Sequence, residues 1–181
     1  MKIKEKILGI IFVSVYIYLI LINQELIGYS KNSMERNARK SQQIDKEWAV
    51  AKSINDDLGA FLFYSDDLTN FTYSIYRTRN GASIGYFFIN GGRIGGISDD
   101  FCIFEDRDNG DIILSLNKIN ISRIEIKDGL ENVKTVEVDP NNPFSIIIPK
   151  NIIEISVYDT NNELIEPKDM HRVDITRIST N

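Results

Sequence analysis

The stretch "FTYSIYRTRNGASIGYFFIN", residues 71–90, decides the fold class, because two runs of β-branched and aromatic residues flank an Asn-Gly pair. Such runs are typical of strands. Asn80-Gly81 predicts the two-residue turn of a β-hairpin, since both residues accept a positive φ. With that turn, Ile75 lies opposite Tyr86 on the neighbouring strand.

A second glycine pair follows in "FFINGGRIGGIS", residues 87–98. We expect another hairpin turn at residues 91–92, which sets the ring of Phe88 over the gap left by Gly95. The spacing also approaches a phosphate-binding loop, but Ile97 stands where that motif needs Lys. The segment that follows reads as acidic and extended, whereas the motif needs a helix N-terminus. The sequence therefore predicts that these glycines allow the sheet to turn and bend, and that the protein has no nucleotide partner.

Similar short runs continue to the C-terminus and are separated by turn residues. They cover residues 58–65, 71–78, 82–90, 93–98, 111–117, 122–127, 134–138, 144–149, 152–159 and 171–178. This pattern predicts a mainly β fold, an antiparallel β-sandwich or open barrel of about nine to ten short strands.

Charge is distributed unevenly along the 181 residues, whose formal net charge is −5. Residues 1–52 hold nine Lys/Arg and five Asp/Glu, a net charge of +4, whereas residues 53–181 hold twelve against twenty-one, a net charge of −9. An acidic body repels phosphates, so no nucleic acid partner is expected. Cys102 is the only cysteine, which excludes an internal disulfide.

The N-terminus predicts a membrane location. A basic start precedes residues 7–22, which carry no charge and span ~24 Å as a helix, against a hydrocarbon core of ~30 Å. We expect residues 1–30 to form an uncleaved signal anchor, a transmembrane helix at the cell membrane with the C-terminal domain outside. The alternative is a cleaved signal peptide and a secreted domain, since Gly28 and Ser30 are small residues suited to cleavage.

Residues 31–54 contain no Gly or Pro and many helix-forming residues. They predict a polar stalk helix whose end, Ile44, Trp48 and Ala51, docks on the domain that follows. That β domain is expected to span residues 55–181.

Aromatic residues suggest a recognition surface. Tyr73, Tyr76, Tyr86 and Phe87, with Phe88 beside them, are candidate ligand-binding residues. The alternative interpretation is that most of these rings belong to the core.

Acidic residues suggest a cation site. Asp99, Asp100, Asp106 and Asp108 are candidate metal ligands, because Ca²⁺ prefers carboxylate oxygens. The calcium-loop pattern is incomplete, since the glycine comes one position early and no Glu closes the loop. The alternative is a hairpin turn at residues 109–110 with solvated acids around it.

No catalytic constellation stands out. His171 is the only histidine, and no serine-hydrolase or zinc-protease motif occurs. We therefore expect no catalytic residue and no cofactor.

The segments "IGYFFINGG", residues 84–92, and "PFSIIIP", residues 143–149, resemble those of small single-anchor extracytoplasmic β-sandwich proteins of Gram-positive bacteria. The resemblance covers residues 58–166 and implies fold and location, but no site residues. The leading hypothesis is a membrane-tethered, non-enzymatic module that binds a protein or a cell-envelope component. The alternatives are a small hydrolase that acts on the envelope through Asp/Glu chemistry and an immunity or accessory protein that partners a membrane protein.

Overall fold

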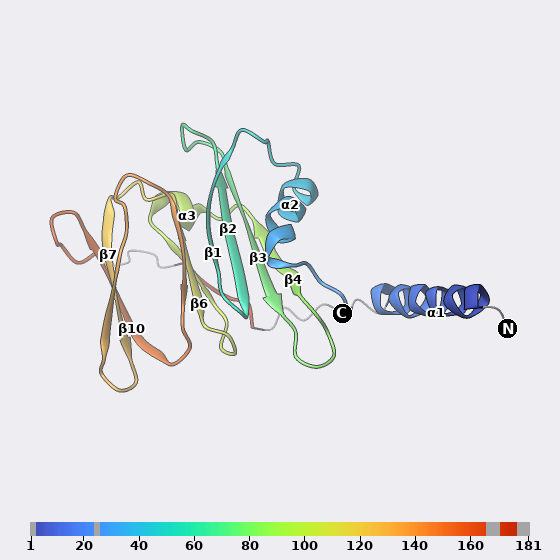
Figure 1. The fold of residues 1–181 in the computed structure, drawn as a ribbon. Coiled ribbons are helices and arrows are strands. Elements are labelled where there is room, and N and C mark those ends of the chain that lie inside the picture. Colours follow the sequence, from blue (N-terminus) through green and yellow to red (C-terminus); the bar gives the residue numbers. More distant parts are fainter. Residues whose placement is uncertain (1–2, 24–25, 166–170, 177–181) are drawn as a thin grey trace.

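A computed structural model describes residues 3–23, 26–165 and 171–176 of the chain (Figure 1). Its helices are α1 (Ile3–Asn23), α2 (Lys31–Ser41) and α3 (Gly95–Asp99). Its strands are β1 (Ala49–Ile54), β2 (Leu58–Tyr64), β3 (Phe71–Thr78), β4 (Tyr86–Gly92), β5 (Cys102–Glu105), β6 (Asp111–Ser115), β7 (Ile121–Asp128), β8 (Val133–Glu137), β9 (Phe144–Ile148), β10 (Ile152–Asp159) and β11 (His171–Asp174).

The strands form three sheets. The first sheet has the order β1-β2-β3-β4, the second β11-β5-β6-β9 and the third β10-β7-β8. Their pairings are antiparallel except for β11 with β5, which is parallel. Figure 1 shows the sheets layered one after another, with α2 on the outer face of the first. The predicted mainly β, antiparallel fold is confirmed.

The second sheet is buried on both faces, which explains its nearly continuous apolar runs. Cys102 and Phe104 of β5 face the core shared with the first sheet, whereas Ile103 faces the core shared with the third. In β6, Ile113 likewise faces the third sheet and its neighbour Ile112 the first. Period-two alternation therefore distributes apolar side chains between two cores rather than between core and solvent.

The helix α2 covers the outer face of the first sheet through one apolar edge. Met34 and Ala38, one helical turn apart, are buried against Phe61 and Tyr76. The approach is close, because a Cβ on Gly59 would lie 2.9 Å from the sulfur of Met34.

The predicted stalk helix over residues 31–54 is wrong in its second half. The helix ends at Ser41, and residues 49–54 form β1, which pairs with β2. Ile44 and Trp48 do pack against the domain, although they come from a turn rather than from a helix. This segment mixes helix-favouring Ala and Lys with strand-favouring Val50 and Ile54, and pairing to β2 outweighs the weak intrinsic preference for helix.

The β3–β4 hairpin is confirmed, but its predicted register is wrong. Ile75 pairs with Asn90 instead of Tyr86, and a register shift follows at Tyr76. The reason lies in the connecting loop, whose residues are also held by the segment that follows α1. Thr78 pairs with Tyr86, so residues 79–85 form the connection instead of a two-residue turn. Within this loop, the N–H of Gly28 donates to the Ile84 carbonyl at 2.7 Å.

The predicted second turn at residues 91–92 is also wrong, because β4 continues to Gly92 and residues 95–99 form α3 instead of a strand. Phe88 therefore pairs with Tyr76, not with Gly95. At Gly91 the absence of a side chain still allows a close approach of neighbouring groups, because an added Cβ would lie 2.7 Å from both Gln42 Nε2 and the Tyr73 carbonyl oxygen.

The N-terminal helix α1 extends away from the sheets (Figure 1). Apolar side chains are exposed all around it: Ile7, Leu8, Ile10, Ile11, Phe12, Val13, Val15, Tyr16, Ile17, Tyr18, Leu19 and Ile20. Within the described ranges, no helix has both the length and the apolar character required to cross a membrane.

Candidate binding site

The aromatic residues singled out from the sequence lie in the core. Tyr73, Tyr76, Tyr86 and Phe87 are at most 7% exposed, so their rings do not form a recognition surface together. Burial raises the pKa of Tyr73 to about 12, and its hydroxyl donates to Asn90. The remaining neighbour of this group, the ring of Phe88, is 43% exposed.

The acidic candidates are not brought together as a metal site. Asp106 is fully buried and its carboxylate lies 2.8 Å from a guanidinium nitrogen of Arg77. The same carboxylate accepts the backbone N–H of Asp108 at 3.1 Å. Asp99 and Asp100 belong to α3 and its C-cap. In the part of the chain that the structure describes, no three His, Cys, Asp or Glu side chains form a metal-binding group.

The predicted hairpin turn at residues 109–110 is confirmed, but the prediction that the acids around it are solvated is wrong for Asp106, which is fully buried. The N–H of Gly110 donates to the Asp106 carbonyl at 2.8 Å, and Gly110 has a φ of +105°. The turn connects β5 to β6, and the buried carboxylate of Asp106 holds it in shape.

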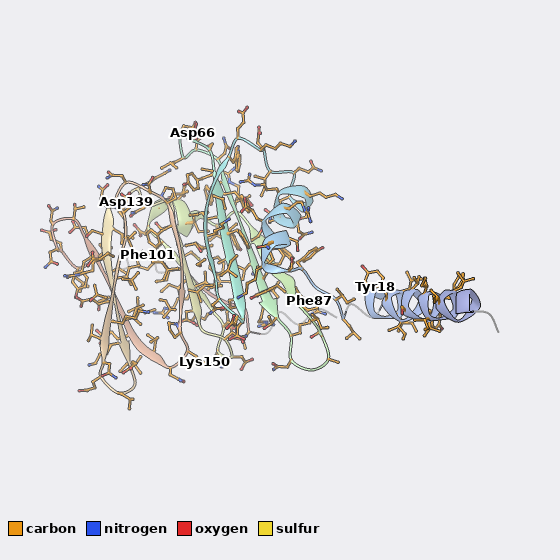
Figure 2. The ribbon with its side chains drawn as sticks, in the orientation of Figure 1. Tyr18, Asp66, Phe87, Phe101, Asp139 and Lys150 are labelled. Carbon is orange, nitrogen blue, oxygen red and sulfur yellow. The ribbon has the colours of Figure 1, made fainter. Side chains whose placement is uncertain are left out.

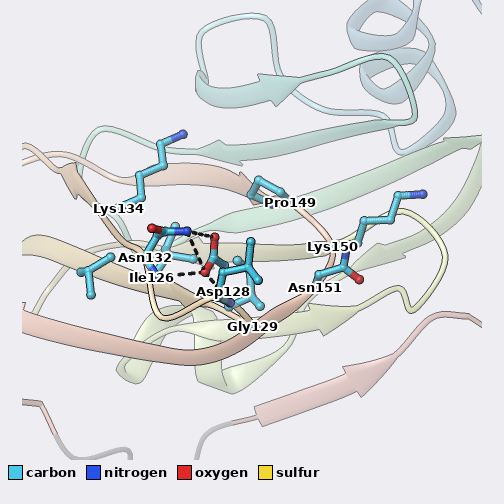
Figure 3. A pocket seen from close by; sticks show the side chains of 11 residues that line it. Ile126, Asp128, Gly129, Asn132, Lys134, Pro149, Lys150 and Asn151 are labelled. Carbon is cyan, nitrogen blue, oxygen red and sulfur yellow. Dashed lines mark hydrogen bonds between the residues drawn. The ribbon is translucent and has the colours of Figure 1, made fainter.

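A pocket of about 540 Å³ opens between the tip of the β7–β8 hairpin and the β9–β10 turn (Figure 3). Its volume lies within the usual range for small-ligand sites. We refer to it as the hairpin pocket, which is lined by Ile126, Asp128, Gly129, Leu130, Asn132, Val133, Lys134, Pro149, Lys150, Asn151 and Ile152.

The first wall of the hairpin pocket is a tightly bonded turn. The carboxylate of Asp128 accepts the N–H of Leu130 at 2.8 Å and the N–H of Asn132 at 2.9 Å. The side-chain amide of Asn132 donates to the same carboxylate, and this bond contributes most to lowering the pKa of Asp128. Figure 3 shows the bonded pair on the pocket wall. The turn is therefore held by hydrogen bonds within the chain.

The second wall is anchored to two other turns. The N–H of Gly129 donates to the carbonyl of Asn151 at 3.2 Å, which joins the two walls directly. The ammonium group of Lys150 donates to the Asp108 carbonyl at 2.9 Å, which joins this wall to the β5–β6 turn. Asn151 itself has a φ of +70°, a conformation that Asn tolerates.

The hairpin pocket combines exposed apolar groups with positive charge. Leu130 is 83% exposed and Val133 58% exposed at its mouth, whereas Ile126 is buried beneath them. Lys134 and Lys150 lie on opposite sides of the pocket (Figure 3). This arrangement suits a partner that presents an apolar group next to an anionic one.

The lining does not present the pair of carboxyl groups that glycoside hydrolysis uses. Asp128 is its one carboxyl group, and the turn already occupies both oxygens of that group. Carboxylate-based hydrolysis of a glycoside requires two carboxyl groups about 5–9 Å apart. The lining residues include no His, Cys, Ser or Thr that could act as a nucleophile or base.

The hairpin pocket belongs to the third sheet, at the end of the molecule opposite α1. Figure 2 labels Lys150, which lines the pocket, at the lower left of the β domain, and Tyr18 of α1 on the right. The sequence predicts strands at 122–127, 134–138, 144–149 and 152–159 around these residues, but no site between them. The sequence signal that could have pointed to it is the placement of two apolar residues, Leu130 and Val133, among the turn residues at 128–132.

Searches of protein-family models, of curated proteins and of solved structures found no match for this chain.

Proposed function

We propose that this chain is a membrane-tethered β module, displayed outside the cytoplasmic membrane, that binds a protein or another cell-envelope component without catalysis. The observation that carries the proposal is the preformed hairpin pocket at the end of the β domain opposite α1. A module tethered by one end presents its opposite end to partners in the surrounding medium.

The tether is the first part of the proposal. The described apolar side chains of α1 are exposed to an extent that water disfavours, since each buried apolar side chain contributes about 1.5–3 kcal/mol. No described helix is long and apolar enough to cross a membrane, so the anchor is inferred from the exposure of these side chains and from residues 7–22, which carry no charge.

The binding site is the second part. Small partners are bound best where a rigid, partly apolar surface already exists, because little ordering is required on binding. The hairpin pocket meets this condition through the Asp128 turn and the bond between Gly129 and Asn151.

A photo-crosslinking amino acid at Leu130 tests the binding site in living cells. We expect a defined adduct after irradiation, and we expect Val133→Glu in the same chain to abolish it by placing a charge at the pocket mouth. Lys118 is a matched control position, since it is exposed and does not line the pocket. The same adducts at both positions, or none at Leu130, would contradict the proposed binding site.

A further inference from the structure

The outward face of α2 is basic. Met34 and Ala38 face the sheet, whereas Arg36 and Lys40 are exposed one helical turn apart on the other side. Lys46, from the turn after the helix, joins them along a shallow depression of about 460 Å³. We call Arg36, Lys40 and Lys46 the basic face.

The cations of the basic face are not neutralised by the fold. Among the described residues, none of the three has an ion-pair or hydrogen-bond partner. The neighbouring cation Arg39, in contrast, has partners within the fold: it forms an ion pair with Glu35 and donates to the carbonyls of Asp45 and Trp48. Three uncompensated charges on one face are therefore available to an anionic partner.

The chain path places the basic face next to α1. Helix α2 begins at Lys31, eight residues after α1 ends at Asn23. Residues 26–29 are held against the sheet, because the N–H of Ile84 donates to the Leu26 carbonyl at 2.8 Å and the N–H of Tyr29 donates to the Tyr86 carbonyl at 2.7 Å. Figure 1 shows α2 on the side of the β domain from which α1 extends.

Exposed apolar side chains accompany the basic face on this side. Ile84 at the tip of the β3–β4 hairpin is 70% exposed, and Tyr29 is 39% exposed. The two are close, because Ile84 bridges to Ile27 and Tyr86 bridges to Tyr29. Aromatic and apolar groups beside basic ones are typical of a surface that lies at a membrane–water interface.

We propose that the basic face binds the anionic phospholipid headgroups of the membrane that holds α1, an inference that rests on the proposed function. Each basic residue near an anionic bilayer strengthens local binding by roughly fivefold. Residues 53–181, with a net charge of −9, are repelled by the same surface. The two effects together orient the β domain with α2 against the lipid and the hairpin pocket away from it.

A dye on α2 reports this contact in the full-length chain. Ser41→Cys places the label at the exposed C-terminal end of the helix, and Cys102 does not compete because it is buried with its pKa raised to about 12. The labelled chain is reconstituted into vesicles of phosphatidylcholine alone or with one-third phosphatidylglycerol. Quenching by acrylamide, a neutral solute, measures exposure of the dye to water.

We expect the quenching constant to be at least twofold lower in the vesicles that contain phosphatidylglycerol. The triple variant Arg36→Gln/Lys40→Gln/Lys46→Gln is expected to abolish the difference. Arg93→Gln/Arg107→Gln/Lys118→Gln is the matched control, since it removes the same charge from exposed positions outside α2 and outside the hairpin pocket, and it is expected to keep the difference.

Flotation of the same vesicles separates the two proposals. A chain that does not float with either vesicle contradicts the proposed tether and with it the lipid contact. A chain that floats but shows equal quenching in both vesicles contradicts the lipid contact alone. Protection that the triple Gln variant does not reduce also overturns it, because the contact would then not depend on these charges.

Discussion

The guanidinium of Arg77 on β3 lies 2.8 Å from the carboxylate of Asp106, and this ion pair joins the first sheet to the β5–β6 turn of the second. The side chain of Asp106 is fully buried and that of Arg77 is 15% exposed. The same carboxylate shapes the turn through the N–H groups of Asp108 and Asn109. One buried charge thus connects two sheets and a turn.

Removal of the cation is expected to destabilise the fold strongly. Arg77→Met leaves the Asp106 carboxylate buried without its partner, which costs about 3–5 kcal/mol. Urea unfolding followed by circular dichroism measures the loss. Asp106→Asn is the comparison variant and is expected to lose less stability. It keeps an oxygen that accepts the turn's N–H groups, and the Arg77 cation that it leaves unpaired is partly exposed. A loss of stability as large as that of Arg77→Met would contradict this explanation.

Glycine positions 91 and 95 are expected to respond differently to alanine. Gly91→Ala pushes a methyl group against Gln42 and the Tyr73 carbonyl, at a cost of about 1–3 kcal/mol. Gly95→Ala finds its nearest neighbour, an Asp99 oxygen, at 3.8 Å, so stability is expected to stay equal or rise by up to about 1 kcal/mol. Thermal unfolding of the two variants measures the difference in stability. Equal losses of stability would show that the close approach of neighbouring atoms to Gly91 is unimportant.

Stability is expected to fall at alkaline pH because of buried tyrosine. The pKa of Tyr73 is raised to about 12 in the folded chain, against ~10 in the unfolded chain. The contribution of Tyr73 to the free energy of unfolding is fully present below pH ~10. It is lost as the pH rises toward 12, because in that range the Tyr73 hydroxyl loses its proton only in the unfolded state.

Urea unfolding midpoints measured between pH 9 and 12 check this dependence. Tyr73→Phe loses the hydrogen bond to Asn90 at every pH, but its stability is expected to fall less steeply in the alkaline range. Parallel slopes for the variant and the natural chain would contradict the assignment to Tyr73.

Charged residues within α1 are expected to release the protein from membranes. Ile11→Lys/Val15→Lys places two ammonium groups on an exposed apolar helix, and each costs about 2.5–3.5 kcal/mol at the centre of a membrane helix. Fractionation of cells should move the chain from the membrane to the supernatant. Ile11→Leu/Val15→Leu is the control and should remain with the membrane; release of both variants, or of neither, would contradict the role given to α1.

Strands with a clear turn at each end could be predicted from the sequence. The runs at 71–78 and 152–159 match β3 and β10 in their bounds, because β-branched and aromatic residues stop at residues that favour turns. Strand β1 could not be found in this way, since "AVAKSI" mixes helix-favouring Ala and Lys with strand-favouring Val and Ile and lacks Gly or Pro at its start; its pairing with β2 decides for a strand.

The candidate site was harder to predict than the fold. The hairpin pocket depends on the bond from Gly129 to Asn151, two residues that are distant in sequence and meet only because β7 pairs with β10. The predicted aromatic surface is wrong because long-range packing buries it. Tyr76 looks like a recognition residue in the sequence, but α2 covers it, and its hydroxyl donates a hydrogen bond to the Asn37 side chain of that helix.

The most direct test of the account is protease accessibility of the β domain in intact cells, with lysed cells as the control. An external protease is expected to remove the domain in intact cells while a cytoplasmic marker protein survives, as a module tethered by α1 and displayed outside requires. Protection of the domain until the cells are lysed would place it inside and contradict the central claim.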